Sequence, residues 1–210
     1  NVTVNSSGLG KALDFAEGAF SSIPGLGSSS LKDIPTYYVT DLHLGPQTPA
    51  FDIASVFGPA LVRVTVDSAN DNMADEDGVL YNKSFTEILF YPSGRVGEFA
   101  LKSSVTKIGA NVFSNKSYLT GITVTGAVTS IGENAFNGSK NLAFIRFEGE
   151  GTSLTVGDYA FYGCSGLTEL ALPAYTASIG AYAFNSCTGL TQITIPSGVK
   201  TVGDYAFRSC

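Results

Sequence analysis

Three cysteines are the side chains in this 210-residue sequence with the most obvious capacity for chemistry. Cys164, Cys187 and Cys210 stand 23 residues apart, and thiolates can bind metals or exchange disulfides. Structural zinc sites use cysteine pairs with the short C-x₂₋₄-C spacing, and the sequence has no such pair. Three evenly spaced cysteines are also no disulfide framework. We therefore predict no metal and no cofactor, but a ladder of small buried thiols that pack like apolar side chains.

His43 is the only histidine, and it lies between two leucines. A Ser-His-Asp or Cys-His catalytic device would need this residue as its base. No G-x-S-x-G, H-E-x-x-H or S-x-x-K motif accompanies it, so we interpret His43 as a solvent-facing surface residue. The sequence thus predicts a protein that is not an enzyme. A hydrolase site within residues 1–60 that depends on His43 is the weakest of the alternatives.

The most acidic segment is DSANDNMADEDG, residues 67–78. Its Asp75-x-Asp77-Gly78 pattern resembles part of a calcium-binding loop. However, Met73 holds the first ligand position of that pattern, and Ser84 holds the twelfth, where a bidentate glutamate is needed. We interpret the segment as a solvated loop that precedes a hairpin.

The cysteines belong to a longer phrase that the chain repeats. An aromatic residue after Ala or Val returns every 23 or 25 residues, at Phe113, Phe136, Phe161, Phe184 and Phe207. A leucine follows six residues after most of these and opens the pattern L-x-x-φ-x-φ, where φ is apolar: Leu119, Leu142, Leu167 and Leu190. The alternation of apolar and polar residues at the end of this pattern is typical of a β-strand.

Weaker copies of the pattern extend toward the N-terminus. They are Val96-Phe99-Leu101, Leu61-Val64-Val66 after Val56-Phe57, Val39-Leu42-Leu44, and Ala19-Phe20 with Leu26. The interval between the openings at 61 and 96 is 35 residues, which indicates an insertion. We predict irregular N-terminal repeats over 1–60 and regular repeats over 61–210. The insertion at 67–95 is expected to hold a loop and a β-hairpin, the hairpin at 78–92.

Such a period predicts a solenoid, because one repeat is too small to bury its own apolar side chains and must stack on its neighbours. The expected fold class is an α/β solenoid, mostly β, with a parallel strand ladder and at most one helical turn per coil. The phenylalanines should point inward. A glycine at each sharp turn should have a positive φ or a close backbone approach: Gly109, Gly132, Gly157, Gly180 and Gly203.

The repeated phrase resembles the BspA-type leucine-rich repeat of bacterial surface proteins. The match I-G-x-x-A-F-x-x-C-x-x-L-x-x-I-x-I-P is most complete over 179–196, and DGVLYNKSFTEILFYPSG (77–94) resembles a hairpin of the same family. Lys116 and Ser139 depart from it, because they replace the cysteine. The resemblance implies a right-handed leucine-rich-repeat coil on a cell surface, used for adhesion or partner binding and without catalysis.

The strand pattern also predicts which side chains face outward. The second and fourth residues after each opening position should point away from the core. Aromatic and arginine side chains dominate binding hot spots, so we select Phe144, Arg146, Glu169, Gln192 and Arg63 as candidate ligand-binding residues. Tyr159, Tyr182 and Tyr205 form a second array, at positions that hold Asn111 and Asn134 in earlier repeats. These tyrosines either cover the edge of the core or contact a partner.

Composition narrows the class of partner. Hydrophobic residues make up 44% of the chain, charged residues 14%, and the net charge is −6, which argues against nucleic acid as a partner. No apolar run is long enough for a membrane span, and Asn1 indicates a processed or trimmed chain. We predict a cell-surface or secreted protein that binds a protein or glycan of a host or neighbouring cell. The alternative is an architectural spacer within a larger surface protein, whose chain continues past Cys210.

Overall fold

The computed structural model describes residues 2–4, 39–46, 48 and 58–210. The chain divides into two units: Asn1–Ser84 with Pro92–Arg95, here called the N-terminal unit, and Phe85–Tyr91 with Val96–Cys210, the C-terminal unit. The repeat copies predicted at Ala19-Phe20 and Val56-Phe57 lie outside the described residues.

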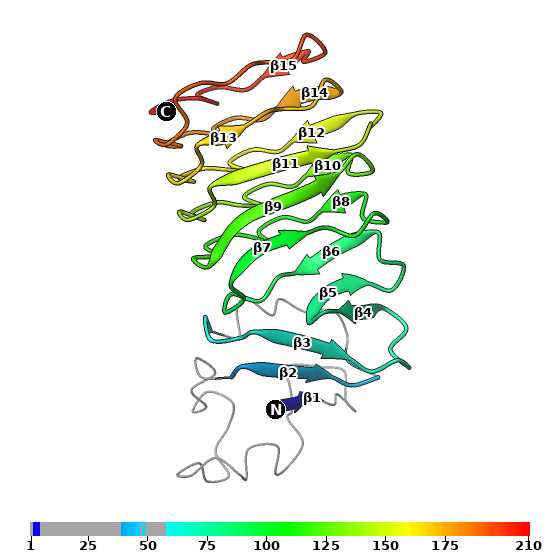
Figure 1. Cartoon of the computed structure of the whole chain (residues 1–210). Helices are drawn as coiled ribbons and strands as arrows, with labels where there is room; N and C mark the ends of the chain where they lie inside the picture. Colours follow the sequence, from blue (N-terminus) through cyan, green and yellow to red (C-terminus); the bar gives the residue numbers. More distant parts are fainter. Residues whose placement is uncertain (1, 5–38, 47, 49–57) are drawn as a thin grey trace. The chain divides into compact units, whose positions relative to one another are not determined.

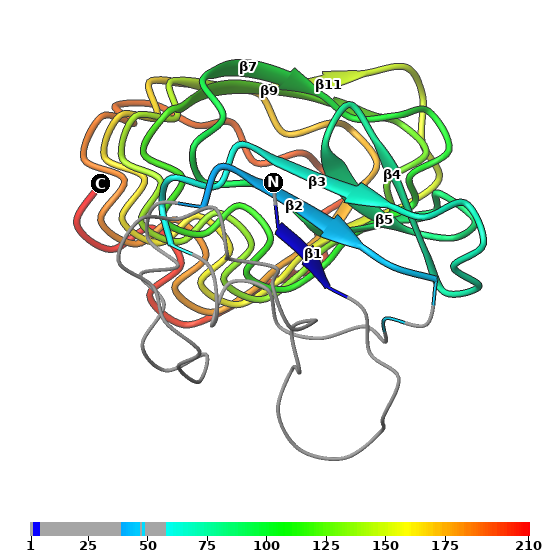
Figure 2. The ribbon, with the colours of Figure 1, turned by 90° about the horizontal axis from the view of Figure 1, so that it is seen from below.

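The C-terminal unit is a β-solenoid built from two parallel ladders (Figure 1). The front ladder runs in the order β7, β9, β11, β13: Gly97–Ala100, Leu119–Thr125, Phe144–Glu148 and Glu169–Leu170. The back ladder runs β6, β8, β10, β12, β14, β15: Glu87–Phe90, Lys107–Ile108, Ser130–Ile131, Leu154–Val156, Thr176–Ile179 and Thr201–Val202. Successive coils of this unit, coloured green to red, nearly superimpose in the end-on view of Figure 2.

A column of phenylalanine rings fills the interior of the coils, as predicted. Phe113 and Phe136 stack at 4.8 Å between ring centroids, and Phe136 and Phe161 at 4.9 Å. The column continues through Phe184 to Phe207 with separations of 5.0 and 5.3 Å. The apolar positions of the strand pattern close the core around it, since Leu119, Ile122 and Val124 are all fully buried. The repeat period therefore places like side chains in contact, which is what stabilises a stack of coils too small to fold singly.

The corner that carries the Ala-Phe pair consists of consecutive turns, and the described residues contain no helix. Each of these corners is tied to the next by the backbone, because the phenylalanine N–H donates to the alanine carbonyl one coil further on. The pairs are Phe113 to Ala135, Phe136 to Ala160, Phe161 to Ala183 and Phe184 to Ala206, at 2.7–2.8 Å. The one helical turn that we allowed per coil is thus replaced by hydrogen bonds between coils.

The cysteines form the predicted ladder. The thiols of Cys164 and Cys187 are buried and free, and each donates to the carbonyl oxygen of a phenylalanine in the preceding coil at 3.0 Å. Ser139 makes the same bond to the Phe113 carbonyl at 2.6 Å, so its hydroxyl substitutes for the thiol. Cys210 makes the bond at 3.2 Å but is exposed. Burial raises the pKa of Cys164, and raises that of Cys187 to about 12, which keeps both thiols protonated and unreactive.

The repeated turn glycines are explained by close approach rather than by positive φ. A Cβ atom on Gly157 would lie 2.9 Å from the backbone of Gly132 and Glu133 in the preceding coil, closer than real Cβ contacts. The left-handed residue comes two positions later, at Asn111, Asn134, Tyr159, Tyr182 and Tyr205, with φ between 55° and 61°. Three of these left-handed residues are tyrosines, for which this conformation is strained.

Val96 departs from the predicted pattern. We expected it to open a copy of the repeat, but its side chain is 77% exposed. The register between β7 and β9 shifts after Gly97, so that Gly97 pairs with Leu119 and Glu98 pairs with Gly121. This irregularity moves Val96 outside the buried column.

The N-terminal unit contains a three-stranded parallel sheet in the order β1, β2, β3, formed by Val2–Val4, Asp41–Leu44 and Arg63–Val66. Leu42 pairs with Val64, as expected from the weak repeat copies, and both are buried. The strands β4 (Met73–Glu76) and β5 (Val79–Asn82) form an antiparallel hairpin within the predicted insertion. The interpretation of the whole segment 67–78 as a loop is wrong, because β4 lies within it. The acidic loop before it folds around buried Asn70, whose side-chain amide donates to the carbonyls of Gly45 and Thr48.

Candidate binding face on the front ladder

The front ladder lines up four outward positions at the same place in successive strands. Glu98 pairs with Gly121, Gly121 pairs with Phe144, and Phe144 pairs with Glu169. The next outward positions form a parallel column in which Arg146 pairs with Thr123. The structure thus brings three of the residues predicted for the site, Phe144, Arg146 and Glu169, onto the neighbouring strands β11 and β13.

Phe144 is held in place by a glycine below it and an arginine above it. Its ring lies against Gly121, where a Cβ atom would overlap the ring. The Arg146 guanidinium lies 4.0 Å from the centroid of the same ring, which is a cation–π contact. Phe144 is therefore half-buried while Arg146 is exposed. A large aromatic side chain fixed in this way loses little conformational entropy when a partner binds.

A hollow of about 470 Å³ lies beside this pair. Its lining comprises Phe144, Ile145, Arg146, Phe147, Glu148, Glu169, Leu170 and Ala171. Two carboxylates, one guanidinium and an apolar floor are thus available to a partner. Such a combination suits binding through an apolar anchor with a charged rim.

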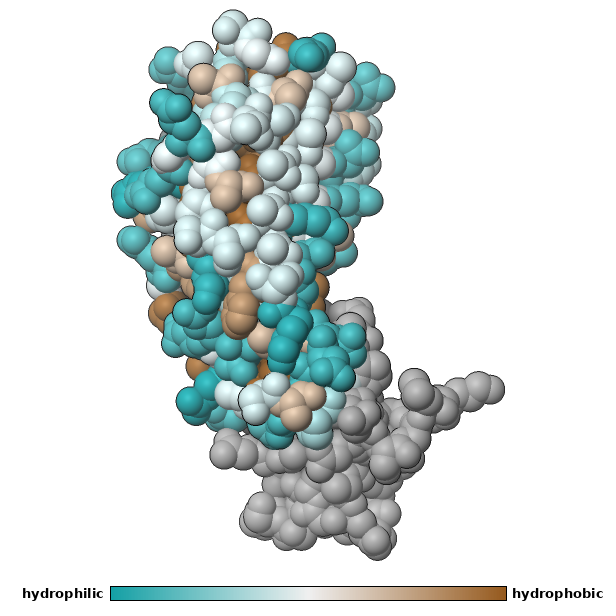
Figure 3. Space-filling view, turned by 90° about the vertical axis from the view of Figure 1, so that its right-hand side faces the viewer, coloured by the Kyte–Doolittle hydropathy of each residue, from teal (hydrophilic) through white to brown (hydrophobic). Residues whose placement is uncertain are grey.

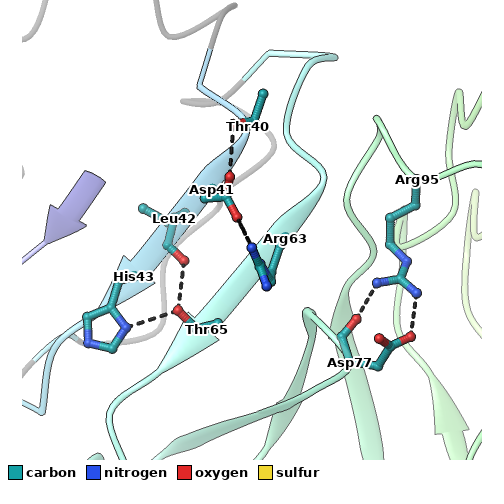
Figure 4. A network of polar contacts seen from close by, with 8 residues as sticks. All are labelled: Thr40, Asp41, Leu42, His43, Arg63, Thr65, Asp77 and Arg95. Atoms are coloured by element: carbon teal, nitrogen blue, oxygen red, sulfur yellow. Dashed lines mark hydrogen bonds and ion pairs between the residues drawn. The ribbon is translucent and has the colours of Figure 1, made fainter. Parts of the chain in front are cut away.

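The remaining two predicted site residues are placed differently. Gln192 is exposed, but residues 190–196 form no strand, so the front ladder ends at β13 within the described residues. Arg63 lies on β3 in the N-terminal unit and forms an ion pair with Asp41 at 2.7 Å (Figure 4). The hydrogen bond from Arg63 is the main reason that the pKa of Asp41 lies below its usual value. The contribution of Gln192 and Arg63 to binding stays a prediction.

Gly121 is a residue of this candidate face that the sequence does not single out. Its place two residues after Leu119 makes it an outward position, but a glycine offers no side chain for binding. The available signal was its position, since it stands one coil before the only aromatic residue in that column. The missing side chain leaves room over the sheet for the far end of the Phe144 ring.

The histidine and two aspartates of the acidic segment make contacts within the protein. His43 is half-buried on the outward side of β2, between buried Leu42 and Leu44, and its Nδ1 lies 3.0 Å from the Thr65 hydroxyl (Figure 4). Asp75 accepts a hydrogen bond from the Val66 amide, and Asp77 forms an ion pair with Arg95. Among the residues that the structure describes, no group of three or more His, Cys, Asp or Glu side chains could hold a metal ion. The described part of the chain also has no helix long and apolar enough to cross a bilayer.

Figure 3 shows the hydropathy of one side of the protein. On the side drawn in Figure 3, the coloured residues are mainly hydrophilic or neutral, and the hydrophobic ones form small separate spots. Scattered apolar residues of this kind are normal for a protein surface.

Comparison with known proteins identifies the class. The family model for the BspA type leucine-rich repeat region matches six copies over residues 83–210, which is more than half of the chain. The chain therefore belongs to the BspA-type leucine-rich-repeat family, as its repeated phrase indicated. A comparison with curated proteins gave no match.

Solved structures agree with this assignment. The pneumococcal vaccine antigen PcpA is 26% identical with a TM-score of 0.69, and the match covers 79% of this chain and 42% of that one. A leucine-rich cell surface protein from Faecalibacterium prausnitzii A2-165 is 28% identical with a TM-score of 0.68, covering 82% and 46%. A leucine-rich-repeat protein from T. pallidum is 28% identical with a TM-score of 0.55, covering 59% of each chain. This chain spans less than half the length of the first two proteins.

Proposed function

We propose that this protein is a non-enzymatic binding protein of the bacterial cell surface, whose front ladder docks a protein partner. The observation that carries the proposal is the Phe144–Arg146 pair, fixed over Gly121 beside a hollow with an apolar floor. Aromatic and arginine side chains are enriched among the few residues that dominate binding in protein interfaces. A pair that is already ordered before binding adds to this, because less side-chain freedom is lost.

The location at the cell surface is supported by the relatives. One of the solved structures is described as a cell surface protein and another as a vaccine antigen. The match covers less than half of each of those two proteins. The extension of their descriptions to this chain is therefore part of the proposal.

The charges of the hollow indicate the kind of protein surface that would fit. Glu148 and Glu169 contribute two carboxylates against the single guanidinium of Arg146. A partner that presents an apolar side chain next to a lysine or arginine would place opposite charges together. Adhesion to a host or neighbouring cell through such a partner is the function we propose.

The test is a binding screen of the intact chain on immobilised extracellular-matrix proteins and glycans, followed by substitution. We expect retention on a protein, and a loss of affinity of at least tenfold in Phe144→Ala, the fold-change typical of a hot-spot residue. Arg146→Ala should weaken binding too, and less than additively in the double variant, because the two side chains act as a pair. Tyr118→Ala, which removes an aromatic side chain that is 53% exposed and does not line the hollow, is the matched control.

Two outcomes would overturn the proposal. Tight protein binding that is unchanged in Phe144→Ala and Arg146→Ala would place the partner on another surface. Failure to retain any matrix protein or glycan would favour the architectural spacer, which needs no ligand of its own.

A further inference from the structure

A column of tyrosines runs along the corner of the coils, away from the front ladder. Tyr159 and Tyr182 stack at 4.9 Å between centroids with an interplanar angle of 3°, and Tyr182 and Tyr205 at 5.1 Å. Tyr162 adds a tilted ring 5.8 Å from Tyr159. Because the rings stack face to face, they present their edges and hydroxyl groups outward rather than their faces.

The backbone beneath this column is strained for the residues that it carries. Tyr159, Tyr182 and Tyr205 have φ values of 55°, 55° and 58°. Asn111 and Asn134 occupy the same position in the earlier coils, and asparagine tolerates this conformation far better than tyrosine does. The three C-terminal coils thus carry a bulky residue where the turn itself favours a small polar one. Strain of this kind collects at functional sites.

A hollow of about 640 Å³ lies along the column. Its lining residues are Glu133, Asn134, Asn137, Tyr159, Tyr162, Tyr182, Asn185, Ser186, Arg208 and Ser209. No aliphatic side chain is among them, so the hollow offers hydroxyls, amides and aromatic edges but no apolar anchor point. It extends over successive coils, each of which advances the column by about 5 Å.

Some of these polar groups are already oriented by one another. The Asn137 side-chain amide donates to Asn134 Oδ1 at 2.7 Å, and the Ser186 hydroxyl donates to Asn185 Oδ1 at 2.7 Å. Within the described part of the protein, the hydroxyls of Tyr159, Tyr162 and Tyr182 form no hydrogen bond. A ligand rich in hydroxyl groups could pair with all of them.

The charges along this edge disfavour an anionic ligand. Glu133 and Arg208 balance each other within the hollow, and two exposed acids, Asp158 and Asp204, directly precede tyrosines of the column. Phosphate or sulfate groups would meet carboxylates here, and there is no row of cations to bind them. A protein epitope, for its part, would need an apolar pocket to fill.

From these observations the geometry points to a second binding site, a groove along the tyrosine column that takes a linear, uncharged oligosaccharide. The sugar chain lies along the stack, and its hydroxyls pair with the tyrosine hydroxyls and asparagine amides of successive coils. This site shares no lining residue with the hollow on the front ladder. Oligosaccharide binding at this site can therefore be tested separately from protein binding at the front ladder.

The experiment is a glycan array probed with the intact chain, in which neutral oligosaccharides, sulfated and sialylated glycans, and matrix proteins are separate arms. We expect neutral oligosaccharides to be retained, with affinity that rises from disaccharide to tetrasaccharide as more coils are engaged. Tyr182→Asn, which installs the residue that earlier coils carry there, should lower this affinity about tenfold or more. Tyr182→Phe keeps the ring stack and removes one hydroxyl, so its loss should be smaller, about threefold.

Folding and surface controls accompany these variants. Tyr182→Asn suits the left-handed backbone, so its melting temperature reports whether the groove was lost with the fold intact. Phe144→Ala should leave sugar binding unchanged. The proposal is overturned if no neutral oligosaccharide is retained, if only charged glycans or proteins are retained, or if Tyr182→Asn binds sugar as well as the parent chain.

Discussion

The ring of Phe144 rests on Gly121, its register partner in the neighbouring strand, so closely that a methyl group at position 121 would overlap it. The orientation of the most prominent side chain on the front ladder is thus set by a residue without a side chain. This relationship makes the two positions interdependent in a way that can be measured.

Gly121→Ala should move Phe144 without unfolding the protein. The atoms that a Cβ would meet are at the far end of the Phe144 side chain, which can swing outward, so we expect the free energy of unfolding to change by less than about 1 kcal/mol. The contact between Arg146 and the ring should break, and affinity for a front-ladder partner should fall about tenfold. NMR shifts of the Arg146 side chain, which lies over the ring, report the displacement. Unchanged shifts in Gly121→Ala would contradict this picture.

Gly157→Ala should be much more damaging than a glycine substitution nearby. A Cβ at 157 would meet backbone atoms of the preceding coil at 2.9 Å, and backbone cannot swing aside. We expect a loss of more than about 2 kcal/mol in chemical denaturation. Gly163→Ala is the control: it has a φ of 68° but open space around its Cβ, so only the backbone strain of about 1 kcal/mol applies. Equal losses in the two variants would refute the close-packing explanation.

Lys116 gives the stability of the C-terminal unit a defined dependence on pH. Its side chain is 4% exposed, its Nζ lies 4.9 Å from the Phe90 ring centroid, and burial lowers its pKa from 10.5 to about 8. Below pH 8 the folded chain must bury the ammonium group, which costs roughly 3 kcal/mol. As pH rises from 8 past 10.5, the unfolded chain loses its proton too, and the penalty disappears.

The corresponding measurement compares the parent chain with Lys116→Met at each pH. The variant should be more stable than the parent at pH 7. This advantage should shrink as the pH rises toward and past 10.5, because Lys116 then becomes neutral in the unfolded parent chain as well. Taking the difference removes the titration of other groups, such as Tyr81, whose pKa burial raises to about 12. Lys140→Met, at an exposed position, should show no such trend. A constant difference between parent and Lys116→Met across this range would be evidence against a buried charge.

The cysteine ladder predicts selective reactivity. In the folded protein only Cys210 is exposed, so a maleimide should label one thiol per chain, and three after unfolding. Intact-mass spectrometry counts the labels directly. Rapid labelling of Cys164 or Cys187 under native conditions would show that the corner opens locally.

The loss of stability on substituting a cysteine of the ladder should depend on hydrogen bonding more than on side-chain size. Cys187→Ser keeps a donor for the Phe161 carbonyl, as Ser139 does for the Phe113 carbonyl, so it should cost less than Cys187→Ala. The alanine variant loses the thiol bond, while the Phe161 carbonyl keeps the bond from the Cys164 backbone N–H, so the cost should be about 0.5–1.5 kcal/mol in the free energy of unfolding. If serine proves the worse replacement, the thiol acts by packing alone.

Much of the fold could be predicted from the sequence because inward positions repeat. The phenylalanine column, the thiol ladder and the pairing of Leu42 with Val64 all follow from a period in which like residues stack. Exceptions depend on contacts between coils that a pattern of residue types does not encode. Val96 is exposed because the register between β7 and β9 shifts. The turn glycines are required by the close approach of the neighbouring backbone, whereas the positive φ is adopted two residues later, by tyrosines in the last three coils.

The candidate site could be predicted only in part, for a related reason. Outward positions were correctly ordered along β11 and β13, but strand formation stops before Gln192, where the same sequence pattern continues. The role of Gly121 depends on how one ring lies on the sheet. A side chain's orientation at a surface is decided by its neighbours, and these become known only with the register.

The backbone bonds between consecutive phenylalanine and alanine corners have a mechanical consequence. They point along the stack and join each coil only to its neighbours, so a force that pulls the C-terminal unit from its end would meet one set of bonds at a time. The unit would lengthen in instalments, a coil of about 23 residues releasing roughly 75 Å of extended chain at each step. Under a sudden force, this unit would therefore unfold coil by coil and absorb the work in steps, instead of unfolding in a single event.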